Sequence, residues 1–488
     1  MVNVAHSQAY IEFVFSSSGQ CTALQLGSNC VLKMSEEDKS KKLENLLKLL
    51  QLNNGDTSKF TQEQKKAMKD HKFWRTQPVK DFDEKVEEEG PIDEAKTPED
   101  ISDKPLPLLS SFEWCHIDVD NKKELEDVFV LLNENYVEDR DAGFRFNYTK
   151  EFFNWALKSP GWKKEWHIGV RVRETQKLVA FISAIPVTLG VRGKEIPSVE
   201  INFLCVHKQL RSKRLTPVLI KEITRRVNKC DIWHALYTAG IVLPAPVSTC
   251  RYTHRPLNWK KLYEVDFTGL PDGYTEEDMI AENALPTNTK TAGLRKLKEE
   301  DIDQVFDLFN KYQSRFDLIQ IFTKEEFKHY FIGEASLPLE KQVVFSYVVE
   351  QPDGRITDFF SFYSLPFTIL NNKSYKDLGI GYLYYYATDA DFQFKDRFDP
   401  KATKALKKRL GELIYDACIL AKNANMDVFN ALTSQDNTLF LDDLKFGPGD
   451  GFLNFYLFNY RANPITGGLN RDNTNDVGKR SNIGVVML

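Results

Sequence analysis

The stretch ELEDVFVLLNENY, residues 124–136, returns later in the chain as DIDQVFDLFNKYQ, residues 301–313. Val128 and Phe129 of the first copy match Val305 and Phe306 of the second. Shortly after each copy, YTKEFF at 148–153 parallels FTKEEF at 322–327. Each copy therefore predicts a helix, a loop, and a second helix that begins at a threonine cap.

Runs of strand character follow both copies of the repeat. They lie at 166–172, 178–189 and 198–206 in the first half, and at 343–349, 358–370 and 381–388 in the second. A helix and a further strand come next, at 216–229 and 232–240, and again at 404–425 and 426–434. The order α-α-β-β-β-α-β thus occurs twice.

Two copies of one mixed unit predict an α/β fold (mixed α+β) in which the units share a continuous twisted sheet with helices over its faces. The element order is typical of GNAT-type acyltransferases, so we expect two fused GNAT-like units. We place the first unit at 110–290 and the second at 291–488. Residues 34–109 are expected to form a flexible N-terminal region.

Composition narrows the classes of function. The net charge of −5 lacks the basic surplus of a nucleic-acid-binding protein, so no nucleic-acid partner is expected. Apolar runs stay well below the ~18 residues of a membrane span. The seven cysteines are dispersed without a CxxC pair, which indicates reduced thiols and a cytoplasmic protein. The eight histidines show no metal-binding spacing, and we predict no metal site.

The N-terminal region differs from the rest of the chain. Residues 1–33 hold two of the seven cysteines but lack the basic start of a secretory signal, so we interpret them as an atypical, disordered extension. Met34 then opens a segment that looks like an ordinary protein start. Residues 42–52 have leucines at helical spacing and predict a short amphipathic helix whose role stays open. Residues 79–107 are acidic and proline-rich, and predict an extended or flexible segment.

One stretch, PSVEINFLCVHKQLRSKRLTPVLIKEI at 197–223, combines a buried strand, a basic loop and a helix. Thr216 as cap and Pro217 as first helical residue would start the helix. A helix N-terminus behind Arg211, Lys213 and Arg214 is suited to bind an anion such as a CoA pyrophosphate. GNAT-type enzymes usually carry glycines in this loop, and none is present here. A basic surface turn is the alternative interpretation.

Two other patterns resemble catalytic motifs. Cys205 and His207 lie two apart in a strand and could be neighbours, but no third group completes a nucleophilic site. KFGPGDG, residues 445–451, lacks the ending of a phosphate-binding loop and predicts a tight turn before a strand, with Asp450 available as an anionic contact.

Two long signatures make the sequence similar to a known family. EINFLCVHK at 200–208 and KFGPGDG at 445–451 resemble those of the glycylpeptide N-tetradecanoyltransferases, or N-myristoyltransferases. HKFWRTQPV at 71–79, FRFNY at 144–148 and CRYTHRPLN at 250–258 also match, most closely the fungal members. The resemblance runs from Met34 to Leu488.

The resemblance implies where substrates bind. Acyl-CoA would bind mainly to the first half, through residues in three segments: His71, Lys72, Phe73, Trp74, Leu204, Cys205, Val206, Ser212, Lys213, Arg214, Leu215 and Thr216. The second half would hold most of the peptide, with candidate contacts at Tyr136, Asp139, Asp141, Phe144, Phe146, Tyr252, His254, Tyr382 and Asp450. The acidic patch at 138–141 would suit basic residues of the substrate, and a solvated loop is its alternative interpretation.

The activity implied is transfer of a C14 acyl group from myristoyl-CoA, a co-substrate, to the N-terminal glycine of a protein, with no permanently bound cofactor. Partners would be proteins with an N-terminal glycine after Met removal; the ribosome is a further candidate, and the enzyme would be a monomer without a membrane span. Two other classes stay open: a GNAT-type N-acetyltransferase and a non-catalytic acyl-CoA-binding protein.

The same resemblance implies a mechanism. The backbone N–H groups of Phe203 and Leu204 would form the oxyanion hole, and a β-bulge at these residues is expected because such donors must be freed from sheet pairing. The chain ends on the apolar run GVVML, which would bury the α-carboxylate of Leu488. The resemblance makes that carboxylate the base for the substrate amine. A tail that merely packs is the alternative.

Overall fold

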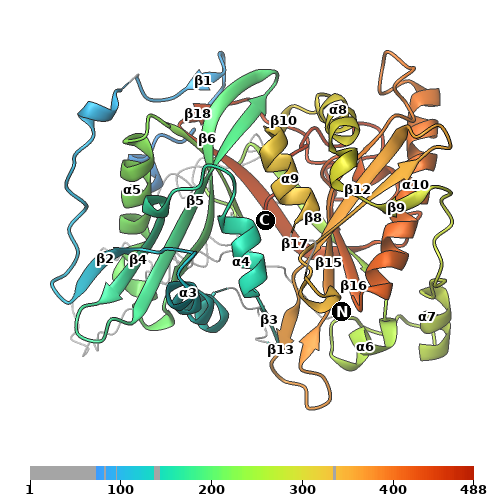
Figure 1. Cartoon of the computed structure of the whole chain (residues 1–488), viewed down its shortest axis with the longest axis horizontal. Helices are drawn as coiled ribbons and strands as arrows, with labels where there is room; N and C mark the ends of the chain where they lie inside the picture. The colour runs from blue at the N-terminus through green and yellow to red at the C-terminus, as the bar shows by residue number, and fades with distance from the viewer. Residues whose placement is uncertain (1–72, 82–83, 95, 137–142, 334–336) are drawn as a thin grey trace, which may run out of the picture.

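The computed structural model describes residues 73–81, 84–94, 96–136, 143–333 and 337–488, which form two similar halves side by side (Figure 1). The predicted amphipathic helix at 42–52 and the extension 1–33 lie outside these residues. The first half contains α3 (Lys122–Asn135), α4 (Lys150–Leu157), β4 (His167–Val172), β5 (Leu178–Val191), β6 (Lys194–Val206), α5 (Leu215–Asn228) and β7 (His234–Ala239).

The second half repeats this order, as the sequence predicts. Its elements are α8 (Ile302–Gln313), α9 (Lys324–Ile332), β11 (Val344–Glu350), β12 (Ile356–Ser364), β15 (Ile380–Thr388), α10 (Pro400–Asn423) and β16 (Val428–Leu432). Thr149 and Thr323 cap α4 and α9 through their side chains, which confirms the predicted caps. The matched valines of the repeat, Val128 and Val305, are both fully buried.

One 13-stranded sheet runs through both halves, which confirms the expected continuous sheet. Its order is β2-β4-β5-β6-β7-β17-β8-β16-β15-β12-β11-β9, with β10 (Leu318–Ile321) paired to β5. The outer strands are β2 (Phe112–His116) and β9 (Leu294–Lys296). In each half the strands on either side of the last helix are parallel, β6 with β7 and β15 with β16. Read inward from the two edges of the sheet, the strands of the two halves therefore follow in the same order.

The centre of the sheet is made by exchanged strands. β8 (Ser248–Pro256) follows the first half in sequence but pairs with β16 of the second. β17 (Gly447–Phe458) follows the second half but pairs with β7 of the first. β8 and β17 also pair with each other. The two halves are therefore interlocked by four central strands rather than joined at a surface.

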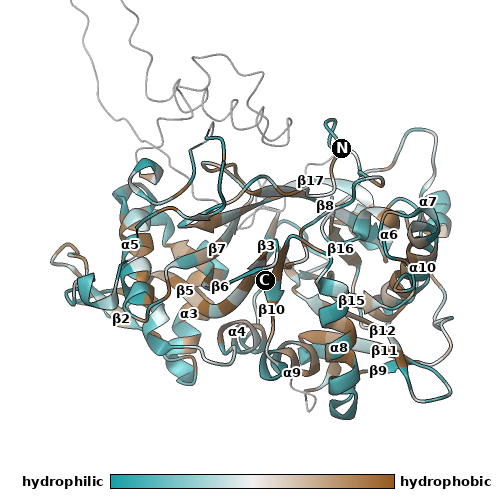
Figure 2. Ribbon diagram, turned by 90° about the horizontal axis from the view of Figure 1, so that it is seen from above, coloured by the Kyte–Doolittle hydropathy of each residue, from teal (hydrophilic) through white to brown (hydrophobic). Residues whose placement is uncertain are grey.

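Helices cover both faces of the sheet, because side chains alternate along each strand. Phe181 of β5 packs in the same cluster as α3, whereas Ile182 packs in the cluster of α5. In the second half α8 and α9 lie against β12, β15 and β11, and α10 lies against β12, β15 and β16. Figure 2 shows α3, α4, α9 and α8 in a row along one side of the sheet.

Smaller elements complete the fold. β3 (Phe144–Phe146), β13 (Phe367–Ile369) and β14 (Asp377–Leu378) form a three-stranded sheet across the two halves. α6 (Trp259–Glu264) and α7 (Glu276–Glu282) lie in the connection between the halves. The described residues of the acidic segment 79–107 include β1 (Gly90–Pro91), which pairs with β18 (Tyr460–Arg461), and a 3-10 turn at Pro98–Asp100.

Two local predictions were wrong. α5 begins at Leu215, not at a Thr216 cap: Arg214 is the N-cap residue, in a left-handed conformation that ends the 3-10 turn Lys208–Lys213. Pro217 is tolerated because the first turn of a helix has N–H groups without helical partners. The second error concerns residues 447–451, which belong to β17 and not to a turn. There the register against β8 shifts between Pro448 and Phe452, so the glycine-rich residues bulge from the strand.

The C-terminal tail enters the middle of the molecule, where Figures 1 and 2 mark the chain end. Asn482 accepts hydrogen bonds from the backbone N–H groups of Asp317 and Leu318, and Gly484 and Val485 donate to the Leu318 carbonyl. The tail thus pairs with β10. Ile483 and Val485 are fully buried, which confirms the predicted burial of the apolar ending.

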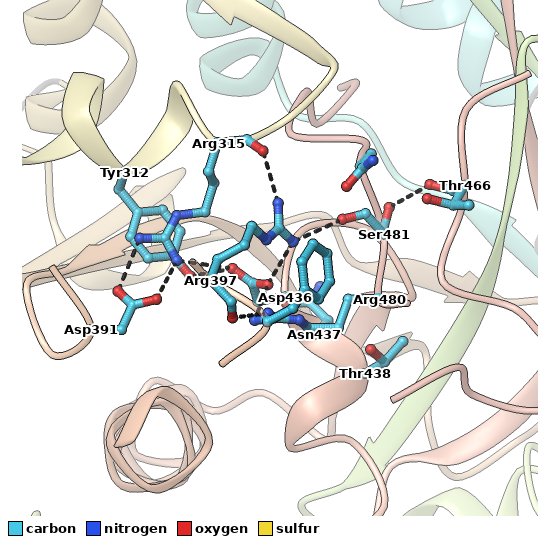
Figure 3. A network of polar contacts seen from close by, with 12 residues as sticks. Tyr312, Arg315, Asp391, Arg397, Asp436, Asn437, Thr438, Thr466, Arg480 and Ser481 are labelled. Atoms are coloured by element: carbon cyan, nitrogen blue, oxygen red, sulfur yellow. Dashed lines mark hydrogen bonds and ion pairs between the residues drawn. The ribbon is translucent and has the colours of Figure 1, made fainter. Parts of the chain in front are cut away.

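A buried carboxylate anchors the tail upstream of this pairing. Figure 3 shows the guanidinium groups of Arg315, Arg397 and Arg480 converging on Asp436. Arg480 lies 3.0 Å from the Asp436 carboxylate, and both side chains are fully buried. Burial alone would raise the pKa of Asp436, but the three arginine charges, with that of Arg397 largest, lower it. Removing one partner from such a buried ion network costs about 3–5 kcal/mol.

We expect Gly484→Ala to destabilise the protein by about 1–3 kcal/mol, the usual range for overpacking. A Cβ at this position would lie 2.7 Å from Gln313 Oε1, 2.7 Å from the Phe316 ring and 2.9 Å from Ile319. Urea denaturation measures the effect. Gly478→Ala is the matched control in the same tail, because the nearest atom to its added Cβ lies at 3.5 Å. Equal midpoints for the two variants would contradict the prediction.

Candidate active site

A β-bulge interrupts β6 at the predicted position. β5 and β6 pair Phe181 with Cys205 and Ser183 with Asn202, so Phe203 and Leu204 together oppose one residue of β5. Phe203 has a positive φ of 55°, which an L-residue rarely adopts. The backbone N–H of Phe203 hydrogen-bonds the Tyr136 hydroxyl, outside the sheet. The bulge therefore turns a backbone donor away from strand pairing, as expected from the sequence.

The strands β6 and β7 separate just before this bulge. They pair at Ser198–His234, Val199–Ala235 and Glu200–Leu236, and both strands continue beyond these pairs. A cavity of about 990 Å³, including its open mouth, lies where they diverge. It is lined from the bulge by Asn202, Phe203 and Leu204.

The larger part of the cavity is apolar and lies along α5. Ile182 of β5, Val199 and Ile201 of β6, Ile220 and Ile223 of α5, and Ala235 of β7 line it. Trp74 closes one wall, stacked on Tyr237 at 5.5 Å between ring centres, and Tyr237 stacks in turn on Tyr456 at 5.0 Å. Phe73 lies edge-on to Trp74. An unbranched acyl chain suits such an apolar slot.

The chain end forms another wall of the same cavity. Leu488 lines it together with Phe203, Tyr136 and Tyr148. The tail is held there by backbone hydrogen bonds: the N–H of Val486 donates to the Tyr385 hydroxyl at 2.9 Å, and the N–H of Leu488 donates to the Glu200 carboxylate. The bulge and the C-terminus, far apart in sequence, thus meet at one cavity.

Glu200 is a site residue that sequence reasoning missed. Its side chain is 3% exposed, and burial raises its pKa to about 7, against the lowering effect of its hydrogen bonds with Asn202 and Leu488. Asn202 Nδ2 donates to Glu200 Oε1 at 2.5 Å. The available signal was an acidic residue in mid-strand between Val199 and Ile201, where a charge is costly unless it is hydrogen-bonded.

The predicted peptide contacts meet in an aromatic cluster between the halves. Tyr136 lies 5.8 Å from Tyr148 between ring centres, Phe146 lies 5.6 Å from Tyr148, and Tyr382 stacks on Tyr363 at 5.2 Å. Phe144 and His254 both contact the ring of Phe267. Tyr252 is buried near Tyr363 and Tyr382. These side chains come from both halves, so only the fold brings them together.

The glycine-rich segment of β17 packs over His254. The Nδ1 atom of His254 lies 2.7 Å from Asn430 Oδ1, and burial lowers the pKa of the His254 imidazole. A Cβ at Gly449 would clash with the imidazole and lie 2.9 Å from the Tyr252 carbonyl, which explains the glycine. Asp450 is exposed beside this segment, and its charge acts on both His254 and Arg251.

The basic loop before α5 lies on the surface at the start of the helix. Arg211, Lys213 and Arg214 are exposed, and Arg211 also donates to the Asn135 carbonyl. Ser212 is part of the 3-10 turn, and Leu215 and Thr216 form the first turn of α5. Three cationic residues therefore lie at a helix N-terminus, an arrangement suited to phosphate groups.

Cys205 does not form a nucleophilic pair with His207. The Cys205 thiol is buried, contacts the Leu131 carbonyl, and has its pKa raised by burial to about 12. His207 instead lies 3.5 Å from Lys177 and accepts a hydrogen bond from the backbone of Gln209. Val206 is buried against α5. A thiol held in its neutral form is a poor nucleophile.

Several predicted positions cannot be placed. His71, Lys72, Asp139 and Asp141 lie outside the described residues. Within the described ranges, no group of three or more His, Cys, Asp and Glu side chains could hold a metal ion. Every helix in the same ranges is too short or too polar to cross a bilayer.

Comparison with known proteins decides the family. The model for the N-terminal domain of myristoyl-CoA:protein N-myristoyltransferase matches residues 91–250, and that for its C-terminal domain matches residues 264–486. The chain belongs to the N-myristoyltransferase family. The resemblance noted in the sequence and the doubled GNAT-like fold are thereby confirmed.

Individual N-myristoyltransferases are very similar to this chain. The Saccharomyces cerevisiae glycylpeptide N-tetradecanoyltransferase is 92% identical over 455 residues, covering 93% of this chain and all of the relative. The Candida glabrata enzyme is 73% identical over 449 residues, covering 92% of this chain and 99% of the relative. A crystal structure of the Saccharomyces cerevisiae N-myristoyltransferase with bound myristoyl-CoA matches with a TM-score of 0.87 and 90% identity, covering 92% of this chain and all of that one.

The pKa of Glu200 leads to a stability prediction. Because it is raised from about 4.5 to about 7 by folding, the folded protein holds a proton between these values that the unfolded chain releases. Through this group, the free energy of unfolding of the wild type therefore decreases as the pH rises from about 4.5 to about 7. Glu200→Gln lacks this titration, so its melting temperature minus that of the wild type should increase between pH 5 and pH 8. Calorimetry of both proteins measures it; a difference that is constant with pH would contradict it.

Proposed function

We propose that this enzyme transfers a tetradecanoyl group from myristoyl-CoA to the N-terminal glycine amine of proteins by direct attack of the amine on the thioester. The observation that carries the proposal is the meeting of three features in one cavity. An apolar slot runs along α5, a freed backbone donor lies at Phe203, and the chain end at Leu488 forms the adjoining wall.

The bulge supplies the oxyanion hole in this proposal. Attack on a thioester carbonyl places negative charge on its oxygen, and the backbone N–H groups of Phe203 and Leu204 stabilise that charge. Each such donor contributes about 3–4 kcal/mol to the transition state, because it is oriented before the reaction begins. In the described structure the Tyr136 hydroxyl hydrogen-bonds the Phe203 N–H, so a thioester oxygen would replace it.

The α-carboxylate of Leu488 acts as the base. An α-amino group has a pKa near ~8, so at neutral pH most substrate molecules carry an ammonium that cannot attack. The carboxylate accepts one proton from it, and the neutral amine then forms the C–N bond. The second proton goes to the sulfur as the C–S bond breaks, which leaves an amide and CoA with a free thiol.

The two substrates divide between the two halves, 110–290 for acyl-CoA and 291–488 for most of the peptide. Lys213 and Arg214 at the start of α5 would contact the CoA phosphates, and Phe73 and Trp74 would cover the acyl group. The aromatic cluster with Tyr252, His254 and Tyr382 would take the peptide, with Asp450 at its exposed end. The proposed enzyme is cytoplasmic and monomeric. His71 and Lys72 would complete the acyl-CoA site, and Asp139 and Asp141 would complete the peptide site.

Two other functions make different predictions. A GNAT-type N-acetyltransferase would turn over acetyl-CoA and would not need an apolar slot as long as the one along α5. A non-catalytic acyl-CoA-binding protein would retain its ligand without transfer to any peptide, and would have no use for a donor freed at Phe203.

We expect transfer from tetradecanoyl-CoA to a Gly-x-x-x-Ser peptide, but not to the same peptide with N-terminal Ala or acetyl-Gly. The substrate signature of N-myristoylation requires glycine at the first position, and an acetylated amine cannot attack the thioester. Mass spectrometry of the peptide products measures it. Comparable turnover of the Ala peptide, or turnover of acetyl-CoA alone, would be inconsistent with the proposed function.

Adding two residues after Leu488 should reduce the single-turnover transfer rate by about 100-fold or more, since a general base supplies about 10²–10⁴ in rate. The extension moves the carboxylate but leaves the slot along α5 intact, so the Kd for tetradecanoyl-CoA should stay within about twofold. Leu488→Ala keeps the carboxylate and is the matched control, with a smaller loss. A folded, extended variant with the native rate would show that this carboxylate is not the base.

A further inference from the structure

Glu200 is a buried carboxylate that the reaction as described above does not use. It occupies the last position at which β6 and β7 pair before they diverge around the cavity. It is not one of the described residues that line the cavity, whereas its two hydrogen-bond partners, Asn202 and Leu488, both line it. Glu200 therefore lies directly behind two groups that line the cavity.

The hydrogen bonds that Glu200 accepts are strongest when the group is ionised. Two donors converge on it, the Nδ2 of Asn202 and the backbone N–H of Leu488. An ionised carboxylate accepts both in charge-assisted bonds, whereas a protonated acid or an amide carries a donor of its own and accepts more weakly. Loss of the charge therefore weakens the hold of Glu200 on the two cavity-lining groups.

We propose that ionised Glu200 is a positioning residue that holds the Leu488 carboxylate and the Asn202 side chain in their reactive orientation through these two hydrogen bonds. The inference rests on the proposed function, in which the Leu488 carboxylate is the base. It adds that the orientation of this base depends on the ionisation of a second carboxylate, that of Glu200, which is one hydrogen bond away from the chain end.

The surroundings of Glu200 contain no cation among the described groups that act on it, so its charge is supported mainly by the two donors. The chain end at Leu488 lies beside it on the tail, and the titratable side chains that interact with it are four buried tyrosines: Tyr330 on α9, Tyr363 on β12, and Tyr384 and Tyr385 on β15. Burial raises the pKa of each tyrosine, so these side chains stay neutral. Glu200 is the group among them that changes charge near neutral pH.

The test compares single-turnover transfer by the wild type and by Glu200→Gln across pH 5.5–8.5, with tetradecanoyl-CoA bound in advance and a Gly-x-x-x-Ser peptide added. Titration of the peptide amine affects both proteins equally and cancels in the ratio of their rates. We expect the wild type to be faster by about 10–100-fold at pH 8 and by less than about threefold at pH 5.5, with similar Kd for tetradecanoyl-CoA.

A matched control is Glu195→Gln, an exposed position on the same strand, which should equal the wild type at every pH. A rate ratio for Glu200→Gln that stays constant with pH, or stays at one, would overturn the positioning role, since a purely structural effect of the substitution does not follow the titration of Glu200. Absence of transfer by the wild type would instead overturn the proposed function.

A second measurement needs no variant and no turnover. Hydrogen exchange of the Leu488 amide in the wild type, corrected for the intrinsic pH dependence of exchange, reports its hydrogen bond to Glu200. We expect the protection factor to rise at least about threefold as the pH rises through 7. Protection that does not change with pH would overturn the proposal, even if Glu200→Gln failed to fold.

Discussion

The whole arrangement depends on the hydrogen bonds that carry a free chain end into the centre of the protein. A terminus is ordinarily mobile, and ordering it costs conformational entropy that contacts must offset. Here the backbone pairing of residues 482–485 with β10, the ion network at Asp436 and the apolar side chains of the tail provide those contacts. Without them neither Leu488 nor the wall that it forms would have a fixed position.

The second constraint is geometric, since a sheet normally uses its backbone donors for its own pairing. The fold frees them at one place by combining a bulge at Phe203 with the separation of β6 from β7 after Glu200. The positive φ of Phe203 is strained, and such strain persists where the surroundings fix the backbone. Phe203 is packed among Tyr136, Tyr148 and Phe153, which hold it in place.

Much of the fold could be predicted because the information is local and repeated. The duplicated helix pair, the threonine caps and the apolar strands each follow from nearby residues, and the bulge followed from the family signature. The sequence does not locate the start of α5, because a left-handed Arg214 has no reliable sequence signal, and the glycine-rich residues predict a turn where the chain already forms a strand. The Asp436 network and the role of Glu200 depend on residues far apart in the chain, such as Arg315 with Arg480, which a single sequence cannot pair.

The exchange of β8 and β17 bears on how this protein must be made. Translation proceeds from the N-terminus, and β7 is complete about 200 residues before its neighbour β17 leaves the ribosome. Until then β7 and β8 have open edges, and such edges are sites of aggregation. The first half therefore cannot close its sheet as an independent domain during synthesis, and the last 60 or so residues complete both halves at once. Completion of the central sheet is, for that reason, a late step that both halves share.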